Sequence, residues 1–392
     1  MANVTMTLGA RVHHMRVQPL SIEQNRATVY LAKSLQSLKG RHQGTSIGST
    51  GMTTMEPFCR LDGRSQMSVL VVGGAGYIGA HVVRLLRDDG VDVVVIDDLS
   101  SSSAERVGDA TLVQLDVSAP DAPDAIAQVI REHGVDAVIH FAAKKQVGES
   151  VERPLYYYRQ NIGGLVNVLD AMQRENVKKM IFSSSAAVYG APDESVVTED
   201  SPTAPINPYG QTKLVGEWIL ADCEQAWGLK WVALRYFNVS GAGWPELGDS
   251  AIMNLIPMVL DRLAHREAPR VFGDDYDTPD GTCIRDYVHV KDLAAAHIAA
   301  IAALDAELKH HQFNVGTGTG SSVKEVIEAV GEVSGLDTTP VIDKRRAGDP
   351  PKLIANADRI ADEMGFEARL GLADIVGSAW EAWQAGPRRI TG

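Results

Sequence analysis

Residues 68–81 read SVLVVGGAGYIGAH, and this stretch decides the fold class of the chain. An apolar run over residues 68–72 is followed by Gly73, Gly76 and Gly79 in the spacing GxxGxxG, and an overlapping GxGxxG begins one residue later. A strand, a turn that only small residues permit, and a helix whose amino-terminal amides face a pyrophosphate together form a dinucleotide-binding unit. We therefore expect a dinucleotide cofactor here rather than a purely structural turn.

From residue 68 onward, short β-branched runs alternate with helical stretches, which is typical of a parallel sheet covered on both faces. The expected strands are 68–72, 92–96, 111–115, 137–141, 179–183 and 231–236, and the expected helices include 79–88, 122–132, 165–175 and 209–227. Six such units predict an α/β fold with a doubly wound parallel sheet of the Rossmann type. The alternation loosens after about residue 243, where one more strand and helix are expected near 313–330. We expect a cofactor domain over 67–243 and a smaller α/β substrate domain over 244–392, with some segments crossing back.

Acidic residues follow the second and third expected strands. Asp97 and Asp98 lie about twenty residues after the glycines, where a carboxylate accepts hydrogen bonds from the adenosine ribose. A carboxylate there also repels a 2'-phosphate, so NAD is favoured over NADP. A helix cap or turn is the alternative role for Asp97. Asp116 is expected either near the adenine or as an ordinary turn residue.

The composition excludes several classes of function. A formal net charge of -13 argues against general affinity for nucleic acid, which needs clustered Lys and Arg. Cys59, Cys223 and Cys283 show no CxxC spacing, so neither a disulfide framework nor a zinc site is expected, and a reducing cytoplasm fits. No apolar stretch approaches the roughly 18 residues that span a bilayer, and we expect no membrane segment.

Residues 1–66 differ in composition from the rest of the chain, with eight Lys or Arg against three Asp or Glu. We expect a basic, disordered extension, with Met67 as the functional beginning. An organelle transit peptide is the less favoured interpretation, because the segment shows no convincing amphipathic periodicity.

A second motif indicates chemistry. Tyr209 and Lys213 lie four residues apart at the start of an expected helix, on one face and one turn apart. A tyrosine acts as a base near neutral pH only beside positive charge, which Lys213 and an oxidised nicotinamide would supply. Ser185, at the end of the fifth expected strand, can hydrogen-bond the same substrate hydroxyl. The three residues predict a catalytic set that takes a proton from an alcohol while hydride leaves its carbon.

From Met67 to about Trp383 the chain resembles the extended short-chain dehydrogenase/reductase family. The segments that carry the resemblance are VVGGAGYIGAH, HFAAKKQVGESVERPLYYYRQNI, FSSSAAVYG, NPYGQTK, LRYFNVSGA, DGTCIRDYVHVKDLA and RRAGDPP. The resemblance implies NAD as cofactor, a UDP-sugar as substrate, and Ser185, Tyr209 and Lys213 as the catalytic residues.

The resemblance also implies two sets of binding residues. The NAD site would be lined by the catalytic residues together with Gly73, Gly76, Tyr77, Ile78, Gly79, Asp97, Asp98, Asp116, Val117, Phe141, Ala142, Lys145, Asn161 and Phe237. The UDP-sugar would contact Ser185, Tyr209, Asn238, Asn254, Leu255, Phe272, Arg285, Arg346, Asp349 and Leu353. The two arginines also make independent sense, since a guanidinium suits a diphosphate, although surface ion pairing is the alternative.

Two alanines separate this chain from relatives that eliminate water. Such dehydratases carry Asp and Glu directly after the catalytic Ser or Thr, whereas this chain has Ala186 and Ala187, which can act neither as acid nor as base. We therefore expect oxidation at C4, rotation of the 4-keto sugar about its diphosphate, and return of hydride to the other face. The expected reaction interconverts UDP-galactose and UDP-glucose with NAD kept bound.

Several alternatives stay open. Leu353 has an intermediate size at a position that shapes the sugar pocket in the resembling enzymes, so a UDP-N-acetylhexosamine or a UDP-pentose is the runner-up substrate. A UDP-uronate would need an extra basic group that we cannot place, and a redox-sensing binding module would predict loss of Tyr209 or Lys213. The resemblance implies a homodimer, in which helices over 155–175 and 209–227 pair across a two-fold axis.

Overall fold

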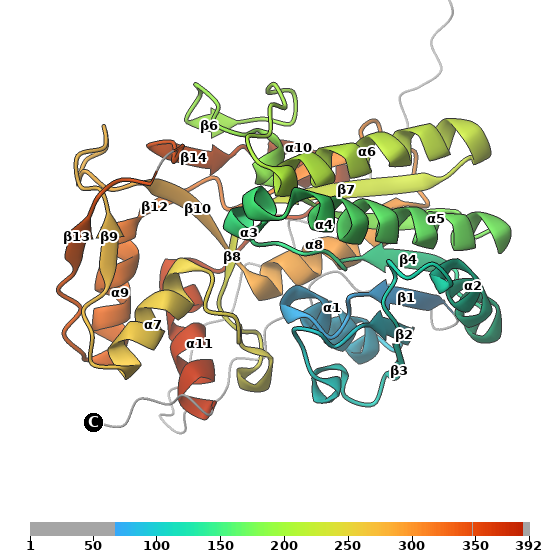
Figure 1. Cartoon of the computed structure of the whole chain (residues 1–392), viewed down its shortest axis with the longest axis horizontal. Helices are drawn as coiled ribbons and strands as arrows, with labels where there is room; N and C mark the ends of the chain where they lie inside the picture. The colour runs from blue at the N-terminus through green and yellow to red at the C-terminus, as the bar shows by residue number, and fades with distance from the viewer. Residues whose placement is uncertain (1–66, 347, 387–392) are drawn as a thin grey trace, which may run out of the picture. The chain divides into compact units, whose positions relative to one another are not determined.

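The computed structural model describes residues 67–346 and 348–386. Its larger sheet has seven parallel strands in the order β11-β7-β5-β4-β1-β2-β3 (Figure 1). The strands are β1 (Ser68–Val72), β2 (Asp92–Asp97), β3 (Thr111–Gln114), β4 (Ala137–His140), β5 (Lys179–Ser185), β7 (Lys230–Tyr236) and β11 (Gln312–Val315). The strand order reverses between β1 and β4, and ligands of doubly wound sheets bind at the carboxyl ends of strands at such a switch point.

Helices cover both faces of this sheet, because successive side chains of a strand point to opposite faces. The odd-numbered residues of β1, both valines, share one apolar cluster with helices α1 (Tyr77–Asp88) and α8 (Val290–Ala303). The even-numbered Leu70 and Val72 share another with α2 (Ala122–His133), α5 (Gly164–Arg174) and α6 (Pro208–Trp227). Burial on both faces explains why every residue of β1 after Ser68 is apolar.

A second lobe is built around a five-stranded sheet, in which β12, β10, β14 and β6 follow one another and β8 also pairs with β10. These strands are β6 (Val196–Val197), β8 (Asn238–Ser240), β10 (Ile284–His289), β12 (Gly320–Ser322) and β14 (Lys352–Ala355). A separate pair joins β9 (Arg270–Phe272) to β13 (Val341–Asp343). Helices α7 (Leu255–Ala264), α9 (Val323–Ser334) and α11 (Leu372–Ala385) contact one another around their own apolar cluster.

Short helical segments complete the connections. They are η1 (Ala104–Val107), α3 (Val147–Glu152), α4 (Pro154–Tyr157), the π-helical turn η2 (Tyr158–Gly163), η3 (Ala186–Val188), η4 (Pro245–Leu247) and α10 (Asp358–Met364). Because η2 joins α4 directly to α5, residues 154–174 form one helix with a π turn in its middle. Such turns often occur at functional sites.

The predicted fold class is confirmed, and the six predicted strands all exist. The count of six for the large sheet is wrong, because β11 pairs with β7 as a seventh strand although it lies far along the chain. Strand β5 also extends to Ser185, two residues beyond its predicted end. The boundary between a cofactor domain and a substrate domain stays a prediction. The predictions for residues 1–66, including Cys59, lie outside the described residues.

Among residues 67–346 and 348–386, no helix is both long enough and apolar enough to cross a membrane.

Candidate active site

The first cleft, of about 470 Å³, lies over the carboxyl ends of β1, β2 and β4. Its floor is the glycine-rich turn between β1 and α1. Gly73 has a φ of 81°, and a Cβ there would lie 2.6 Å from the amide nitrogen of Ala142. A Cβ on Gly79 would collide with the carbonyl oxygen of Gly73. Glycine is therefore required here both by backbone conformation and by the close approach of strand to helix.

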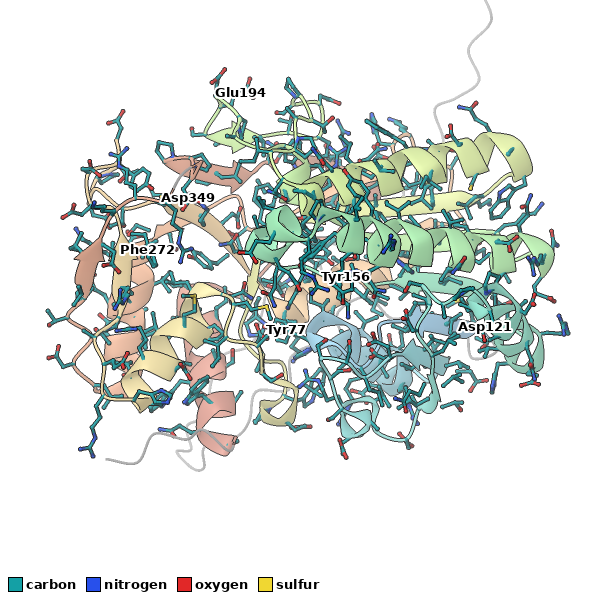
Figure 2. The ribbon with its side chains drawn as sticks, in the orientation of Figure 1. Tyr77, Asp121, Tyr156, Glu194, Phe272 and Asp349 are labelled. Carbon is teal, nitrogen blue, oxygen red and sulfur yellow. The ribbon has the colours of Figure 1, made fainter. Side chains whose placement is uncertain are left out.

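The amino terminus of α1 opens into the first cleft. No side chain caps this helix and its first turn holds no acidic residue, so the amides of that turn can bind an anion in the cleft. Gly76, Tyr77, Ile78 and Gly79 line the cleft at this point, and Figure 2 labels Tyr77. This arrangement fits a diphosphate, which is the central group of a dinucleotide.

Carboxylates lie at one end of the first cleft. Asp97 accepts hydrogen bonds from the backbone amides of Ala75 at 3.0 Å and Leu99 at 2.9 Å, which tie it to the glycine-rich turn. It therefore has the turn-forming role that the sequence left as the alternative, although it also lines the cleft. Asp98 and Asp116 line the cleft as well, each in a turn closed by the amide two residues later.

The candidate catalytic residues come from β5 and α6. Asn207 caps α6 by accepting from the amide of Gly210 at 2.9 Å, so Tyr209 and Lys213 fall in its first two turns, as predicted. The side chain of Ser185, at the end of β5, hydrogen-bonds Tyr209. Nζ of Lys213 donates to the carbonyl oxygen of Ser183 at 2.6 Å, which draws the lysine under the end of β5.

Burial dominates the electrostatics of this pair. It lowers the pKa of Lys213 to about 7, against a smaller opposing effect of the Glu217 carboxylate. Burial also raises the pKa of Tyr209, and the hydrogen bond with Ser185 lowers it again in part. Tyr209 thus needs added positive charge nearby to act as a base.

A buried ion pair lies behind the catalytic helix. The Arg235 guanidinium donates to both carboxylate oxygens of Glu217, at 2.9 and 2.6 Å, and Ser184 donates to the same carboxylate at 2.5 Å. Strands β5 and β7 are thereby joined to α6 one turn beyond Lys213. Since each partner of this network is satisfied, it fixes the position of the helix that carries the catalytic residues.

The second cleft, of about 410 Å³, lies in the second lobe. The structure brings together here seven residues predicted for the substrate: Asn238, Asn254, Leu255, Phe272, Arg285, Arg346 and Asp349. The guanidinium of Arg346 lies 3.9 Å from the centre of the Phe272 ring, and Arg285 forms an ion pair with Asp349 at 3.6 Å. Figure 2 labels Phe272 and Asp349 in this lobe. Two guanidinium groups in one cleft suit a diphosphate.

The two clefts meet at one segment of chain. Asp249, Ser250 and Ala251 line the first cleft, Ile252 lines the second, and Met253 lines both. Arg106 joins the residues just before this segment to the glycine-rich turn, because it donates to the carbonyl oxygens of Leu247, Gly248 and Ala75 at 3.0 to 3.2 Å. A molecule that extends from one cleft to the other would pass beside Met253.

Four predicted residues lie near the clefts but do not line either of them in the described part of the chain: Asn161, Ser185, Phe237 and Leu353. Asn161 is buried and hydrogen-bonds the backbone of Lys144 and the hydroxyl of Thr212. Phe237 and Leu353 pack in a small apolar cluster with Ala186.

The sequence also missed residues that line the clefts. In the first cleft these include Lys144, Glu149, Tyr156, Ser183 and Tyr236, and in the second Ser240, Cys283 and Tyr287. Lys144 could have been noticed as the neighbour of Lys145 directly after a strand. Residues 249–253 carry no local signal, because nothing in their composition indicates which clefts they will border.

The chain is similar to known proteins over most of its length. The model of the NAD dependent epimerase/dehydratase family matches residues 69–316. A UDP-glucose 4-epimerase from Azospirillum brasilense is 47% identical over an alignment of 321 residues, which covers 80% of this chain and 91% of that protein. The solved UDP-glucose 4-epimerase from Brucella ovis, in complex with NAD, has a TM-score of 0.77 at 43% identity, covering 80% of this chain and 97% of its own. The UDP-glucose 4-epimerase from Stenotrophomonas maltophila, solved with NAD and formylated UDP-arabinopyranose, has a TM-score of 0.76 at 40% identity. The match covers 81% of this chain and 98% of that chain.

Proposed function

The chain belongs to the NAD dependent epimerase/dehydratase family, and we propose that it inverts C4 of a UDP-hexose and so interconverts UDP-galactose and UDP-glucose. Relatives at 47% and 43% identity carry the name UDP-glucose 4-epimerase. The observation that carries the proposal is the group of Ser185, Tyr209 and Lys213 beside a cleft that suits a dinucleotide. Two alanines follow Ser185 in the chain.

In the proposed reaction the residues of the chain handle the proton and hold the reactants. NAD, when bound in the first cleft, would supply the reversible hydride chemistry at C4. Tyr209 takes the proton of the C4 hydroxyl, Ser185 hydrogen-bonds that oxygen, and Lys213 in its protonated form supplies positive charge that favours the tyrosinate. Arg285 and Arg346 hold the diphosphate while the keto sugar turns, and Tyr209 then gives the proton back.

Inversion is favoured over elimination of water by the residues after Ser185. Ala186 is buried among apolar side chains, and the amide of Ala187 donates to the Ser185 hydroxyl at 3.2 Å. Neither side chain can move a proton, so the acid and base that dehydratases need at these two positions are missing. The oxidised sugar then has only the return of hydride open to it.

The test is to incubate the purified protein with UDP-galactose, without added NAD, and to assay UDP-glucose. We expect turnover, because the cofactor is proposed to stay bound through a cycle with no net oxidation. Release of a 4-keto-6-deoxy sugar would show a dehydratase, and an absolute need for added NADPH would show a reductase. Either result contradicts the proposal.

A wider substrate range is the second candidate. Leu353 lies on β14 opposite Arg285 of the second cleft, and it packs in the same apolar cluster as Ala186. The resemblance implies that this position shapes the sugar pocket, and its intermediate size supports acceptance of a UDP-N-acetylhexosamine or a UDP-pentose besides UDP-glucose. A panel of UDP-glucose, UDP-N-acetylglucosamine, UDP-xylose and UDP-glucuronate, run on the wild type and on Leu353→Tyr, measures this range. We expect Leu353→Tyr to reduce turnover of the N-acetylated sugar more than that of UDP-glucose.

A homodimer is the proposed assembly. Large apolar side chains stand exposed on adjoining helices: Val151 on α3, Leu155 on α4, Val166 on α5 and Trp218 on α6, the last with 59% of its surface accessible. Exposed apolar side chains on one surface indicate an interface, and a second copy of the chain is the partner that would cover them. We expect the mass of two chains in light scattering, and of one chain for Leu155→Glu. The exposed Val341 of the second lobe serves as the control, since Val341→Glu should leave the mass unchanged.

A further inference from the structure

Lys144 joins two loops that lie on opposite sides of the first cleft. Its Nζ donates to the Ser100 hydroxyl at 2.9 Å and lies 3.5 Å from the Asp98 carboxylate. Asp98 and Ser100 follow β2, whereas Lys144 follows β4. Both strands are neighbours of β1, so the contact passes across the end of the strand that leads into the glycine-rich turn.

Both ends of this contact are held in place. The Asp98 carboxylate accepts from the amide and the hydroxyl of Ser100, at 2.9 and 2.7 Å. On the other side, the Asn161 side chain accepts from the amide of Lys144 at 2.8 Å and donates to its carbonyl oxygen at 3.0 Å. Forming an ion pair costs side-chain entropy, and it costs backbone entropy as well unless the backbone is already fixed.

The Lys144 loop is also connected to the catalytic helix. Asn161 lies in the π-helical turn η2 and also donates to the Thr212 hydroxyl at 3.0 Å, and Thr212 donates to the carbonyl oxygen of Tyr209 at 2.7 Å. Asn161 stays a predicted contact of NAD, and its hydrogen bonds give it a second role. It supports the loop that carries Lys144.

We propose that Lys144 and Asp98 form a clasp across the first cleft, which must open before a bound dinucleotide can leave. The inference rests on the proposed function, since that reaction retains its NAD. The helix amides that suit the diphosphate lie between the two loops, because the glycine-rich turn follows the strand between β2 and β4. A dinucleotide on this turn is therefore covered by the ion pair, and breaking the pair speeds its release.

The charges of the clasp separate this proposal from simple attraction of phosphate. Lys144→Met removes positive charge, so either explanation predicts faster release of NAD. Asp98→Asn removes negative charge, which would slow release if only attraction of the phosphates mattered. The clasp predicts faster release for Asp98→Asn as well, because an amide does not form the ion pair.

The experiment measures how fast the holoenzyme loses isotopically labelled NAD during a chase with unlabelled NAD. The pair is partly exposed, with 24% and 32% of the two side chains accessible, so we expect each variant to release NAD about three- to fivefold faster. The double variant should be no faster than the faster single one, because all three lack the same contact. Added salt should speed release from the wild type and have less effect on the variants.

The ion pair of Lys179 and Asp305 gives a matched control. It has similar exposure, at 28% and 43%, and Lys179 lies at the opposite end of the sheet, where β5 begins. Lys179→Met should therefore release NAD at the wild-type rate. Unchanged release from both clasp variants, or slower release from Asp98→Asn, overturns the clasp alone. A chain that holds no NAD at all overturns both the clasp and the proposed function.

Discussion

The two clefts are built in different ways. The glycine-rich turn of the first cleft comes from one continuous stretch, in which a strand, a tight turn and a helix follow one another within 21 residues from Ser68 to Asp88. The second cleft collects its residues from β8, α7, β9 and β10 and from the loop that leads into β14, over more than a hundred positions of the chain. A local motif can therefore identify the first cleft, whereas only the folded lobe assembles the second.

The difference extends to the charges. Lys213 beside the first cleft is buried, with 3% of its surface accessible, so its protonation depends strongly on its surroundings. Arg346 of the second cleft is exposed, and its guanidinium offers a planar set of donors to an anion. The first cleft therefore holds groups suited to proton transfer beside its dinucleotide site, and the second cleft is suited to holding the anionic part of a substrate. If this division is correct, substitutions in the two clefts should change different kinetic constants.

The largest effect is expected for Tyr209→Phe. Loss of the proton-accepting hydroxyl should reduce kcat about a thousandfold or more, with NAD still bound, because general acid–base catalysis contributes about 10²–10⁴ in rate. Steady-state turnover and the absorbance of bound NAD measure the two quantities. Tyr158→Phe is the control: its hydroxyl, on η2, donates to the side chain of Gln211 on α6 at 2.7 Å, and this variant should keep kcat within about twofold. Equal losses in both variants would mean that the helix, and not the hydroxyl, was disturbed.

Gly79→Ala should disable the first cleft alone. The added methyl group would collide with the carbonyl oxygen of Gly73, so we expect affinity for NAD to fall about a hundredfold as the turn distorts. Calorimetric titration with NAD measures the loss. Gly377→Ala adds the same methyl group to α11 where nothing lies within 4 Å, and it should raise the free energy of unfolding by about 0.5–1 kcal/mol. Unchanged NAD affinity in Gly79→Ala would contradict the assignment of this turn.

Arg346→Met should impair the second cleft alone. A charge-assisted hydrogen bond contributes about 1.5–3 kcal/mol, so KM for the UDP-sugar should rise roughly tenfold or more while NAD retention stays unchanged. The adjacent Arg345 pairs with Asp275 at 2.5 Å and does not line the second cleft, so Arg345→Met is the control and should leave KM unchanged. A faster loss of NAD from Arg346→Met would break the division between the clefts.

The smallest effect concerns the pH dependence of stability after NAD is removed. The pKa of Lys213 is about 7 in the folded protein and 10.5 in the unfolded chain, so unfolding takes up a proton between these pH values. The free energy of unfolding should then rise with pH by about 1.4 kcal/mol per unit in this window through Lys213. Lys213→Met should lose this rise, which denaturant titrations of both proteins between pH 7 and pH 9 would reveal as a difference in slope. Parallel curves would show that Lys213 titrates normally.

The sequence predicted the first cleft well because its residues obey local rules. Spacing of the glycines, the acids after β2 and the Tyr-to-Lys separation on α6 each depend on a few neighbouring residues. The contacts of Asn161 do not follow from such local rules, because the π-helical turn η2 determines that its side chain faces Lys144 and Thr212. The arginines of the second cleft followed only from the resemblance, because no spacing along the chain indicates that Arg285 and Arg346 converge.

In residues 68–81 the strand, the glycine-rich turn and the helix follow from local sequence, since steric limits on φ and the pairing of backbone groups act within a few residues. Tertiary structure alone decided what faces that turn. It brought Lys144 of the β4 loop to Asp98, joined β11 to β7, and placed Met253 between the two clefts. These contacts join residues tens of positions apart, and they form only because burial of both faces of the sheet fixes the order of its strands.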